Sequence, residues 1–431
     1  MRTGEIAMDY FELKKELKED VLRQLLPEAE YTDDEIMEII ESVIHDKSQE
    51  TYMSVVTKLT IKQELFNAIR RLDLLQELLD DPEITEIMVN GGGRIFYEKG
   101  GCLYPWNKKF ESTEKLEDVI QQIVSRSNRQ VNEASPIVDA RLDDGSRVNV
   151  VLKPVAIDGP ILTIRKFSED PVTMDRLVEW GAVSEDAAAL LERLVFAGYN
   201  IFISGSTGSG KTTMLNALAG YIPKDQRVIT IEDSADLQIQ GIANLVRLAV
   251  RNADADGENA ITIRDLIKSA MRMRPERIIV GEIRGPEAID MISAMNTGHD
   301  GSLSTGHSNS VEDMISRLET MILMGTDIPL QAIRKQIASS LDIVVHLGRL
   351  RDKTRKVLEI VEIGDYIDGE IEYNPLYRFE ELPIISENTN YNGEQTKVMG
   401  VLRATGNSLK NTRKLKAAGL YAGSERSAGD A

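Results

Sequence analysis

Residues 205–212 read Gly-Ser-Thr-Gly-Ser-Gly-Lys-Thr, and this stretch decides the fold. The run 200–204 before it predicts a buried strand, and 213–219 after it predicts a helix, with Gly220 where a C-terminal cap is expected. A strand, a glycine-rich loop and a helix in this order are the context that a phosphate-binding P-loop requires. A flexible Gly/Ser linker, the alternative, does not call for such flanks. The sequence therefore predicts a nucleoside triphosphate site.

The residue types of the loop fit the chemistry of a triphosphate. Its glycines let successive backbone N–H groups converge on phosphate oxygens. Lys211 can reach the β- and γ-phosphates, and the Thr212 hydroxyl can hold Mg²⁺. ATP and Mg²⁺ are therefore the expected cofactors. The predicted nucleotide-binding residues are Gly205, Ser206, Thr207, Gly208, Ser209, Gly210, Lys211, Thr212 and Thr213.

The composition is that of a soluble globular protein. The 431 residues are 42% hydrophobic and 28% charged, which fits two or three domains. A formal net charge of −19 argues against a surface devoted to nucleic-acid phosphates. The single cysteine, Cys102, excludes an internal disulfide and a tetracysteine zinc module. The charged start and the lack of a long apolar run predict a cytoplasmic protein without signal peptide or membrane span.

The first 170 residues predict two regions. Residues 1–80 carry apolar residues at helical spacing, with a capping box at Thr32 and Glu35. They predict a helical bundle, for which a partner-docking module is the alternative reading. Residues 81–170 contain strand-like runs around one helix, which predicts an α+β domain. A linker is expected at 168–171.

The remainder predicts an α/β domain and a tail. Strands and helices alternate over 172–383, which is typical of a largely parallel sheet covered by helices. Residues 384–431 are rich in Asn, Gly, Ser and Lys, which predicts a loosely attached polar tail. Strands of the α/β domain are expected at 200–204, 227–231, 277–281, 302–305 and 341–347.

Acidic residues follow two of these strands. ATP hydrolysis needs an acid for Mg²⁺ and a base that orients water, both expected at the carboxyl ends of strands. One strand ends in Glu232 and Asp233, and the next ends in Glu282 in a Walker-B-like pattern. We expect all three to join Thr212 around Mg²⁺, and either glutamate to be the base. A second interpretation has Asp233 capping a following helix while Glu232 faces water.

Histidine is scarce, and two of the four histidines lie close together. Both His299 and His307 are expected near the carboxyl end of another parallel strand, where a γ-phosphate sensor belongs. The other two, His45 and His346, are expected to be structural. The basic cluster 264–277 is either a solvated helix face or a contact with a neighbouring subunit.

In this order, the motifs resemble the secretion and pilus-assembly ATPases of the type II and type IV secretion superfamily. The resemblance rests on the P-loop, the Asp box 230–233, the Walker B stretch 278–282 and the His box 297–310. The chain is similar to the CpaF branch, the motors of tight-adherence (Tad/Flp) pili. The missing tetracysteine sets it apart from the branches that carry a zinc insert. The stretches similar to CpaF are 294–301, 304–307, 131–133, 144–148 and 404–408.

The resemblance implies a fold, a mechanism and partners. It implies a PAS-like α+β domain, a RecA-like ATPase domain, and a hexameric ring with nucleotide between the two domains. It also implies that Arg147 and Arg165 reach the γ-phosphate, whereas ordinary strand arginines would face water. The implied partners are inner-membrane platform proteins of a pilus or secretion machine, which would place the chain at the inner face of the membrane.

The expected function is therefore ATP hydrolysis that powers assembly of a Tad/Flp-type pilus, with extension and retraction both open. A conjugation-type type IV secretion ATPase is the first alternative. A RecA-like nucleic-acid translocase is the second, and the net charge of −19 counts against it. A small-molecule P-loop kinase is the third, and it would need neither the 170 upstream residues nor the His box.

Overall fold

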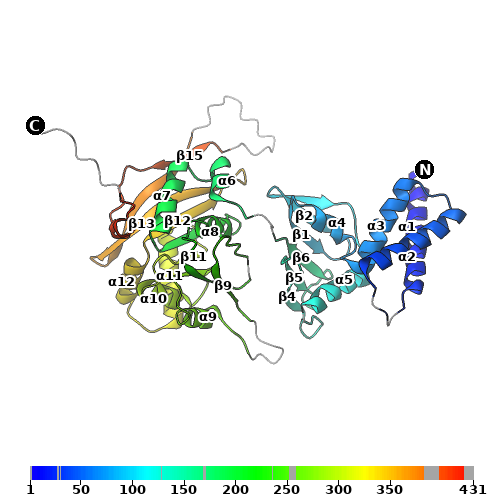
Figure 1. Ribbon diagram of the computed structural model, residues 1–431, viewed down its shortest axis with the longest axis horizontal. Coiled ribbons are helices and arrows are strands. Elements are labelled where there is room, and N and C mark those ends of the chain that lie inside the picture. Colours follow the sequence, from blue (N-terminus) through cyan, green and yellow to red (C-terminus); the bar gives the residue numbers. More distant parts are fainter. Residues whose placement is uncertain are drawn as a thin grey trace, which may run out of the picture. The chain divides into compact units, whose positions relative to one another are not determined.

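The chain folds into two compact units, Met1–Ser168 and Glu169–Ala431, each with its own hydrophobic core (Figure 1). The computed structural model describes residues 2–26, 29, 31–127, 129–167, 171–234, 236–251, 259–382 and 398–421. Of the predicted linker 168–171, residues 168–170 lie outside the described residues. No helix in these ranges is long and apolar enough to cross a membrane.

The first unit begins with three packed helices, α1 (Arg2–Gln24), α2 (Asp33–Glu50) and α3 (Val55–Arg70). They pack because each carries an apolar stripe at helical spacing. The predicted capping box is present at the start of α2. The Glu35 N–H donates to the Thr32 hydroxyl, and the Thr32 N–H donates to the Glu35 carboxylate. The buried core consists of Leu17, Val21, Ile36, Ile40, Val43, Ile44, Met53, Ile61, Leu65 and Phe66.

A six-stranded antiparallel sheet follows helix α4 (Leu75–Asp80), in the order β3-β2-β1-β6-β5-β4. Helix α5 (Thr113–Arg126) covers one face through Leu116, Ile120 and Ile123. This is the expected α+β arrangement, except that β3 was not predicted because Pro105 is unusual within strands. The strands are β1 (Ile84–Asn90), β2 (Ile95–Lys99), β3 (Cys102–Trp106), β4 (Ile137–Arg141), β5 (Arg147–Val151) and β6 (Ile161–Arg165).

The second unit is built on a nine-stranded sheet in the order β15-β14-β13-β12-β7-β11-β10-β8-β9. The strands from β12 to β9 are parallel to their neighbours, as predicted, and β13 to β15 extend the sheet in antiparallel fashion. The strands are β7 (Ile201–Gly205), β8 (Arg227–Glu232), β9 (Asn244–Ala249), β10 (Arg277–Val280), β11 (Leu303–Gly306), β12 (Ile343–Arg349), β13 (Arg355–Ile367), β14 (Glu370–Glu381) and β15 (Gly400–Ala404).

Helices cover both faces of this sheet. Successive residues of β7 show why, since Ile201 and Ile203 enter one core while Phe202 enters the other. On the first face lie α6 (Met174–Glu179), α7 (Glu185–Phe196), α8 (Lys211–Ala219) and α13 (Arg413–Ala417). On the second face lie α9 (Ile263–Ala270), α10 (Ala288–Asn296), α11 (Val311–Gly325) and α12 (Leu330–Ser340).

The prediction of a loosely attached tail from residue 384 is wrong for the part that the structure describes, 398–421. Strand β15 pairs with β14, and α13 buries Leu415 in the core. Lys414 Nζ lies 2.7 Å from an Asp300 carboxylate oxygen and 2.8 Å from one of Asp342. Composition concealed this, because a few apolar side chains anchor a segment that is otherwise polar. The rest of the predicted tail lies outside the described residues.

Candidate functional site

The P-loop connects the central strand β7 to helix α8. Every residue of β7 is buried. The loop follows the last residue of this strand, so it starts at the carboxyl edge of the sheet. A Cβ on Gly205 would lie 2.4 Å from the Leu347 carbonyl oxygen, which is why only glycine fits there. Gly210, just before α8, has φ 96°, a left-handed conformation that glycine adopts without strain. The loop therefore exposes the N–H groups at the start of a helix, which bind phosphate well.

Lys211 is the first residue of α8 and is only 7% exposed. Its Nζ donates to the carbonyl oxygens of Gly205, at 3.1 Å, and Ser206, at 3.0 Å. The same Nζ lies 3.3 Å from His307 Nδ1. The lysine charge thus lies between the P-loop and the His box. The rest of the predicted set, through Thr213, lies in the same loop and the first turn of α8.

Glu232 ends β8 as a buried carboxylate, 3% exposed. One oxygen accepts hydrogen bonds from the Asp236 N–H, at 2.7 Å, and the Leu237 N–H, at 2.8 Å. The other oxygen is buried with no hydrogen-bond partner among the described residues. Burial raises the pKa of Glu232, although the two N–H donors oppose the shift. A raised pKa and an oxygen without a hydrogen-bond partner suit a group that takes a proton from a bound water.

The second interpretation is wrong for Asp233. Asp233 caps no helix, because β8 leads into a loop and then into β9. It is exposed instead, and its carboxylate lies 3.4 Å from an Arg284 nitrogen. Glu232, not Asp233, binds the backbone N–H groups of the following turn.

Glu282 follows β10, the strand beside β8, and is held by Arg284. The Arg284 guanidinium donates to one Glu282 oxygen at 2.8 Å. Burial works against ionisation of Glu282, but the hydrogen bond and charge of Arg284 outweigh it and lower the pKa. Gly281 keeps the two glutamates close, because a Cβ there would lie 3.2 Å from the Glu232 Cγ. Glu282 is thus the ionised partner of the pair.

His307 follows β11 and joins the lysine to this carboxylate. Its Nε2 lies 2.9 Å from Glu282 Oε1, and its Nδ1 faces Lys211. Burial and then the Lys211 charge lower the pKa of His307, so the neutral ring is favoured. A neutral ring can accept from the lysine at Nδ1. Its Nε2 lies beside a buried Glu282 oxygen that has no hydrogen-bond partner among the described residues. His307 therefore lies where the sequence predicted.

His299 does not lie beside the P-loop of this unit. It precedes β11, and the neighbouring Gly301 and Ser302 N–H groups donate to Asn200, which precedes β7. These contacts place His299 at the amino edge of the sheet, opposite the P-loop. Its Nδ1 lies 3.3 Å from the Ala294 carbonyl oxygen. Spacing alone did not reveal that the two histidines lie at opposite ends of one strand.

The carboxyl edge of the sheet offers groups for ATP and Mg²⁺. Lys211 and the loop N–H groups can bind phosphate, and Thr212 with Glu282 can hold the cation. The orphaned, buried Glu232 oxygen fits a site that lacks one polar component. No cluster of three or more His, Cys, Asp or Glu in the described ranges could hold a metal ion.

Two arginines beside the P-loop were missed by sequence reasoning. Arg355 Nε donates to the Gly208 carbonyl oxygen at 2.9 Å, and a Cβ on Gly208 would lie 3.7 Å from an Arg349 nitrogen. The two are Cα partners where β12 turns into β13. Nothing in the sequence pairs this hairpin with the P-loop, because the contact depends on β12 lying next to β7.

Arg147 and Arg165 lie in the first unit, on β5 and β6. They are direct Cα partners, so both project from the same face of the antiparallel sheet. It is the face opposite α5, because the intervening Val148 and Ile164 enter the core that contains that helix. Two like charges in this register repel each other. Glu86 on β1, the Cα partner of Arg165, places a carboxylate beside the pair and offsets part of that cost.

The basic cluster before β10 is not simply a solvated helix face. Arg277 is only 3% exposed, and its Nε donates to Gln226 at 2.7 Å. Burial lowers its pKa to about 10, with nearby carboxylates opposing the shift. Arg264, on α9, lies 2.8 Å from an Asp290 oxygen on α10. These two members therefore have structural partners within the unit.

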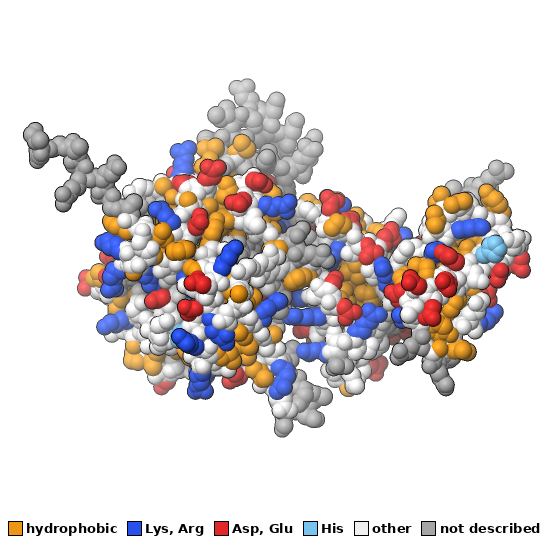
Figure 2. Space-filling model, in the orientation of Figure 1, with side chains coloured by type: hydrophobic (Ala, Val, Ile, Leu, Met, Phe, Trp, Pro, Cys, Tyr) orange, Lys and Arg blue, Asp and Glu red, His pale blue; other side chains and the backbone are white. Residues whose placement is uncertain are grey.

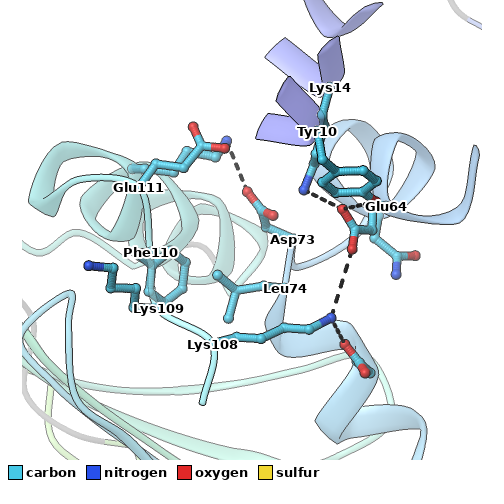
Figure 3. A pocket seen from close by; sticks show the side chains of 12 residues that line it. Tyr10, Lys14, Glu64, Asp73, Leu74, Lys108, Lys109, Phe110 and Glu111 are labelled. Atoms are coloured by element: carbon cyan, nitrogen blue, oxygen red, sulfur yellow. Dashed lines mark hydrogen bonds and ion pairs between the residues drawn. The ribbon is translucent and has the colours of Figure 1, made fainter. Parts of the chain in front are cut away.

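A cavity of about 230 Å³ lies in the first unit, away from these residues (Figure 3). The N-terminal helices and the segment before α5 line it with both signs of charge. Lys14 Nζ lies 2.7 Å from Glu64, and Lys115 Nζ lies 3.4 Å from Asp73. Because opposite charges pair around it, the cavity is a polar joint among α1, α3 and the segments before α4 and α5.

Comparison with known proteins places these features in one family. The family described as "Type II/IV secretion system protein" matches residues 70–403. The conjugal transfer protein TrbB of Rhizobium radiobacter is 31% identical over 319 residues, 72% of this chain and 93% of that protein. The type IV secretion system protein VirB11 of Brucella suis is 33% identical over 306 residues, 64% of this chain and 84% of that protein.

A solved structure agrees with the fold. The ATPase DotB of Yersinia pseudotuberculosis gives a TM-score of 0.52 at 19% identity, covering 68% of this chain and 78% of that chain. At this identity the likeness concerns the fold alone.

Proposed function

The chain belongs to the type II/IV secretion system protein family, and on this premise we propose that it is the ATPase motor of a conjugation-type type IV secretion machine. The observation that carries the proposal is the convergence of Lys211, His307 and Glu282 at the carboxyl edge of a P-loop sheet. The relatives named for conjugal transfer and type IV secretion support the choice of machine.

The residues divide the hydrolysis of ATP among them. Lys211 and the loop N–H groups bind the phosphates and hold the γ-phosphate in place for attack. Glu232 is the base, because its raised pKa and unpartnered oxygen suit it to accept a proton from the attacking water. Glu282 and Thr212 would hold Mg²⁺, which neutralises charge on the β- and γ-oxygens when bound. His307 senses the γ-phosphate through its contact with Lys211.

The proposal also gives a role to the arginine pair of the first unit. Arg147 and Arg165 supply guanidinium groups that stabilise charge on the γ-phosphate in the transition state. Assembly into a hexamer, with nucleotide between the PAS-like and RecA-like domains, would bring such groups to each P-loop. The motor then acts on inner-membrane platform proteins, which place it at the inner face of the membrane.

A Tad/Flp pilus motor is the second candidate function. The stretches 131–133, 144–148 and 404–408, which resemble the CpaF branch, favour it. The two readings share the chemistry of the site and differ in the machine driven. A nucleic-acid translocase fits less well, because the net charge is −19 and both signs of charge are interspersed over the face seen in Figure 2.

Two experiments test the proposal. The purified chain should hydrolyse ATP with Mg²⁺, run as a hexamer, and show no several-fold stimulation by single- or double-stranded DNA at physiological salt. Strong stimulation by DNA would favour the translocase. In the host, deletion of the gene should abolish conjugal transfer and leave surface pili intact, and only the wild-type gene, not Lys211→Ala, should restore transfer. Loss of pili with normal transfer would favour the pilus motor.

A further inference from the structure

His346 is a buried histidine beside the P-loop, on strand β12, and is only 5% exposed. Its Cα partner on β7 is Ser204, the residue directly before the P-loop glycine. The Ser204 hydroxyl oxygen lies 2.9 Å from His346 Nδ1, and both groups are buried. The ring therefore contacts the strand that carries the P-loop.

The same ring also contacts the His box. Burial lowers the pKa of His346, and a hydrogen bond to the Asn309 backbone opposes that shift, so the ring donates to that carbonyl. Asn309 lies two residues after His307, and Ser310 then caps helix α11. With one nitrogen donating to Asn309, the other is free to accept from the Ser204 hydroxyl. One imidazole thus connects the strand before the P-loop to the His box.

We propose that His346 is a positioning residue that holds the His307 loop in register with the P-loop strand. Lys211 and His307 approach within 3.3 Å although 96 positions separate them in sequence. The segments that carry Lys211 and His307 must be fixed relative to each other for this contact to persist. His346 is bonded to both, and its burial among strands leaves the ring little freedom to move.

The surroundings keep the ring in the neutral form that this role needs. Burial lowers the pKa of His346, and the carboxylates of Glu359, Glu312 and Asp313 oppose the shift together with the Asn309 bond. Because the net direction is downward, the ring stays neutral at physiological pH. Sequence reasoning treated this residue as structural, since its two partners lie far away in the chain.

Substitutions can separate the two bonds. His346→Leu removes both at similar volume, Ser204→Ala removes the first, and His346→Gln keeps a donor for Asn309. Hydrogen–deuterium exchange at 306–310 measures the loop directly and does not depend on activity. We expect faster exchange there in His346→Leu, and less change in His346→Gln. His45→Gln, at an exposed position of helix α2, is the matched histidine control and should leave exchange unchanged.

Kinetics test whether the positioning matters for turnover, which rests on the proposed ATPase function. His346→Leu should lower kcat on the order of tenfold, with nearly unchanged binding of a fluorescent ATP analogue, because misplacement by about 1 Å costs that much or more. In a His307→Ala background the same substitution should add little, since His346 acts through His307.

Two outcomes would overturn the role. Wild-type exchange at 306–310 in a folded His346→Leu variant would show that the loop does not depend on the ring. Full additivity of the kcat losses in the double variant would show that His346 does not act through His307. Faster exchange at 306–310 in His346→Leu, in a chain that hydrolyses no ATP even as wild type, would contradict the proposed function and support the positioning role.

Discussion

His307 Nε2 lies 2.9 Å from Glu282 Oε1, while the other ring nitrogen faces Lys211. The three side chains come from the ends of three strands, β11, β10 and β7, that the chain order separates. One imidazole therefore contacts both the group that binds phosphate and the group expected to hold the cation. Any shift of the His box on nucleotide binding would change its contacts with both Lys211 and Glu282.

Lys211→Ala should abolish ATP turnover. No other described cation begins α8 or donates to the Gly205 and Ser206 carbonyls, so the charge at the phosphates has no substitute. A coupled assay of phosphate release measures the loss. Lys224→Ala, an exposed lysine of the same unit, should keep wild-type turnover. Equal activity in the two variants would remove Lys211 from the site.

The two glutamates should differ when each loses its charge. Glu232→Gln should lower kcat strongly with ATP binding near normal, because a base acts mainly in the transition state. Glu282→Gln should also lower kcat, and should in addition raise the Mg²⁺ concentration needed for half-maximal rate. Titration of Mg²⁺ separates the two effects. If both variants turn over ATP at the wild-type rate, the assignment of the site is wrong.

Turnover should fall on the acid side. The pKa of His307 is lowered from 6.5, so its ring is neutral near pH 7 and gains a proton only below pH 6.5. The pKa of Glu232 is raised from 4.5. As the pH falls, this base therefore takes up a proton and loses its charge at a pH above 4.5. Both changes reduce kcat in the same direction. His307→Gln should remove one component and make the acid limb of the kcat profile less steep; an unchanged limb would exclude His307.

Sequence patterns identified the groups at this edge but not their environments. The strand before the P-loop and the acids after β8 and β10 were predictable, because parallel strands deliver their carboxyl ends to one edge. The sequence did not predict which acid would be buried, because this depended on whether a helix or a loop followed Glu232. A loop follows, and its N–H groups draw the Glu232 carboxylate inward.

Long-range pairing also escaped prediction. The two arginines at the β12–β13 turn reach the P-loop only because β12 lies beside β7, and a crossover connection of that kind leaves no local pattern. For the same reason His299 was misplaced, since its neighbours bond to Asn200 at the other end of the strands. Local periodicity predicts elements, and strand order decides which residues meet.

Glu64→Gln should destabilise the joint between helices α1 and α3. The Glu64 carboxylate accepts from the Tyr10 hydroxyl at 3.4 Å and lies 2.7 Å from Lys14 Nζ. Burial, together with Glu64, raises the pKa of Tyr10 to about 12. Because this carboxylate is partly shielded, we expect a loss of about 1 kcal/mol in the free energy of unfolding of the first unit.

Urea unfolding followed by circular dichroism measures that loss. Glu16→Gln breaks a more exposed pair, since Glu16 lies 3.0 Å from Lys47 with its side chain 59% exposed. It should change the unfolding free energy little. Equal stability of the two variants would show that Glu64 does not hold the joint.

Arg147→Ala and Arg165→Ala should each fold, bind ATP and lose most turnover. The paired register holds two guanidinium groups on one sheet face, and a planar guanidinium can bond two phosphate oxygens at once. An arginine that arrives at the γ-phosphate in the transition state is worth roughly 10³ to 10⁵ in rate. Lysine should not restore the rate, because it lacks the fork. Arg94→Ala, an exposed arginine paired with Asp158 in the same unit, is the control and should stay active. Full ATPase activity in either test variant would make that arginine an ordinary strand residue.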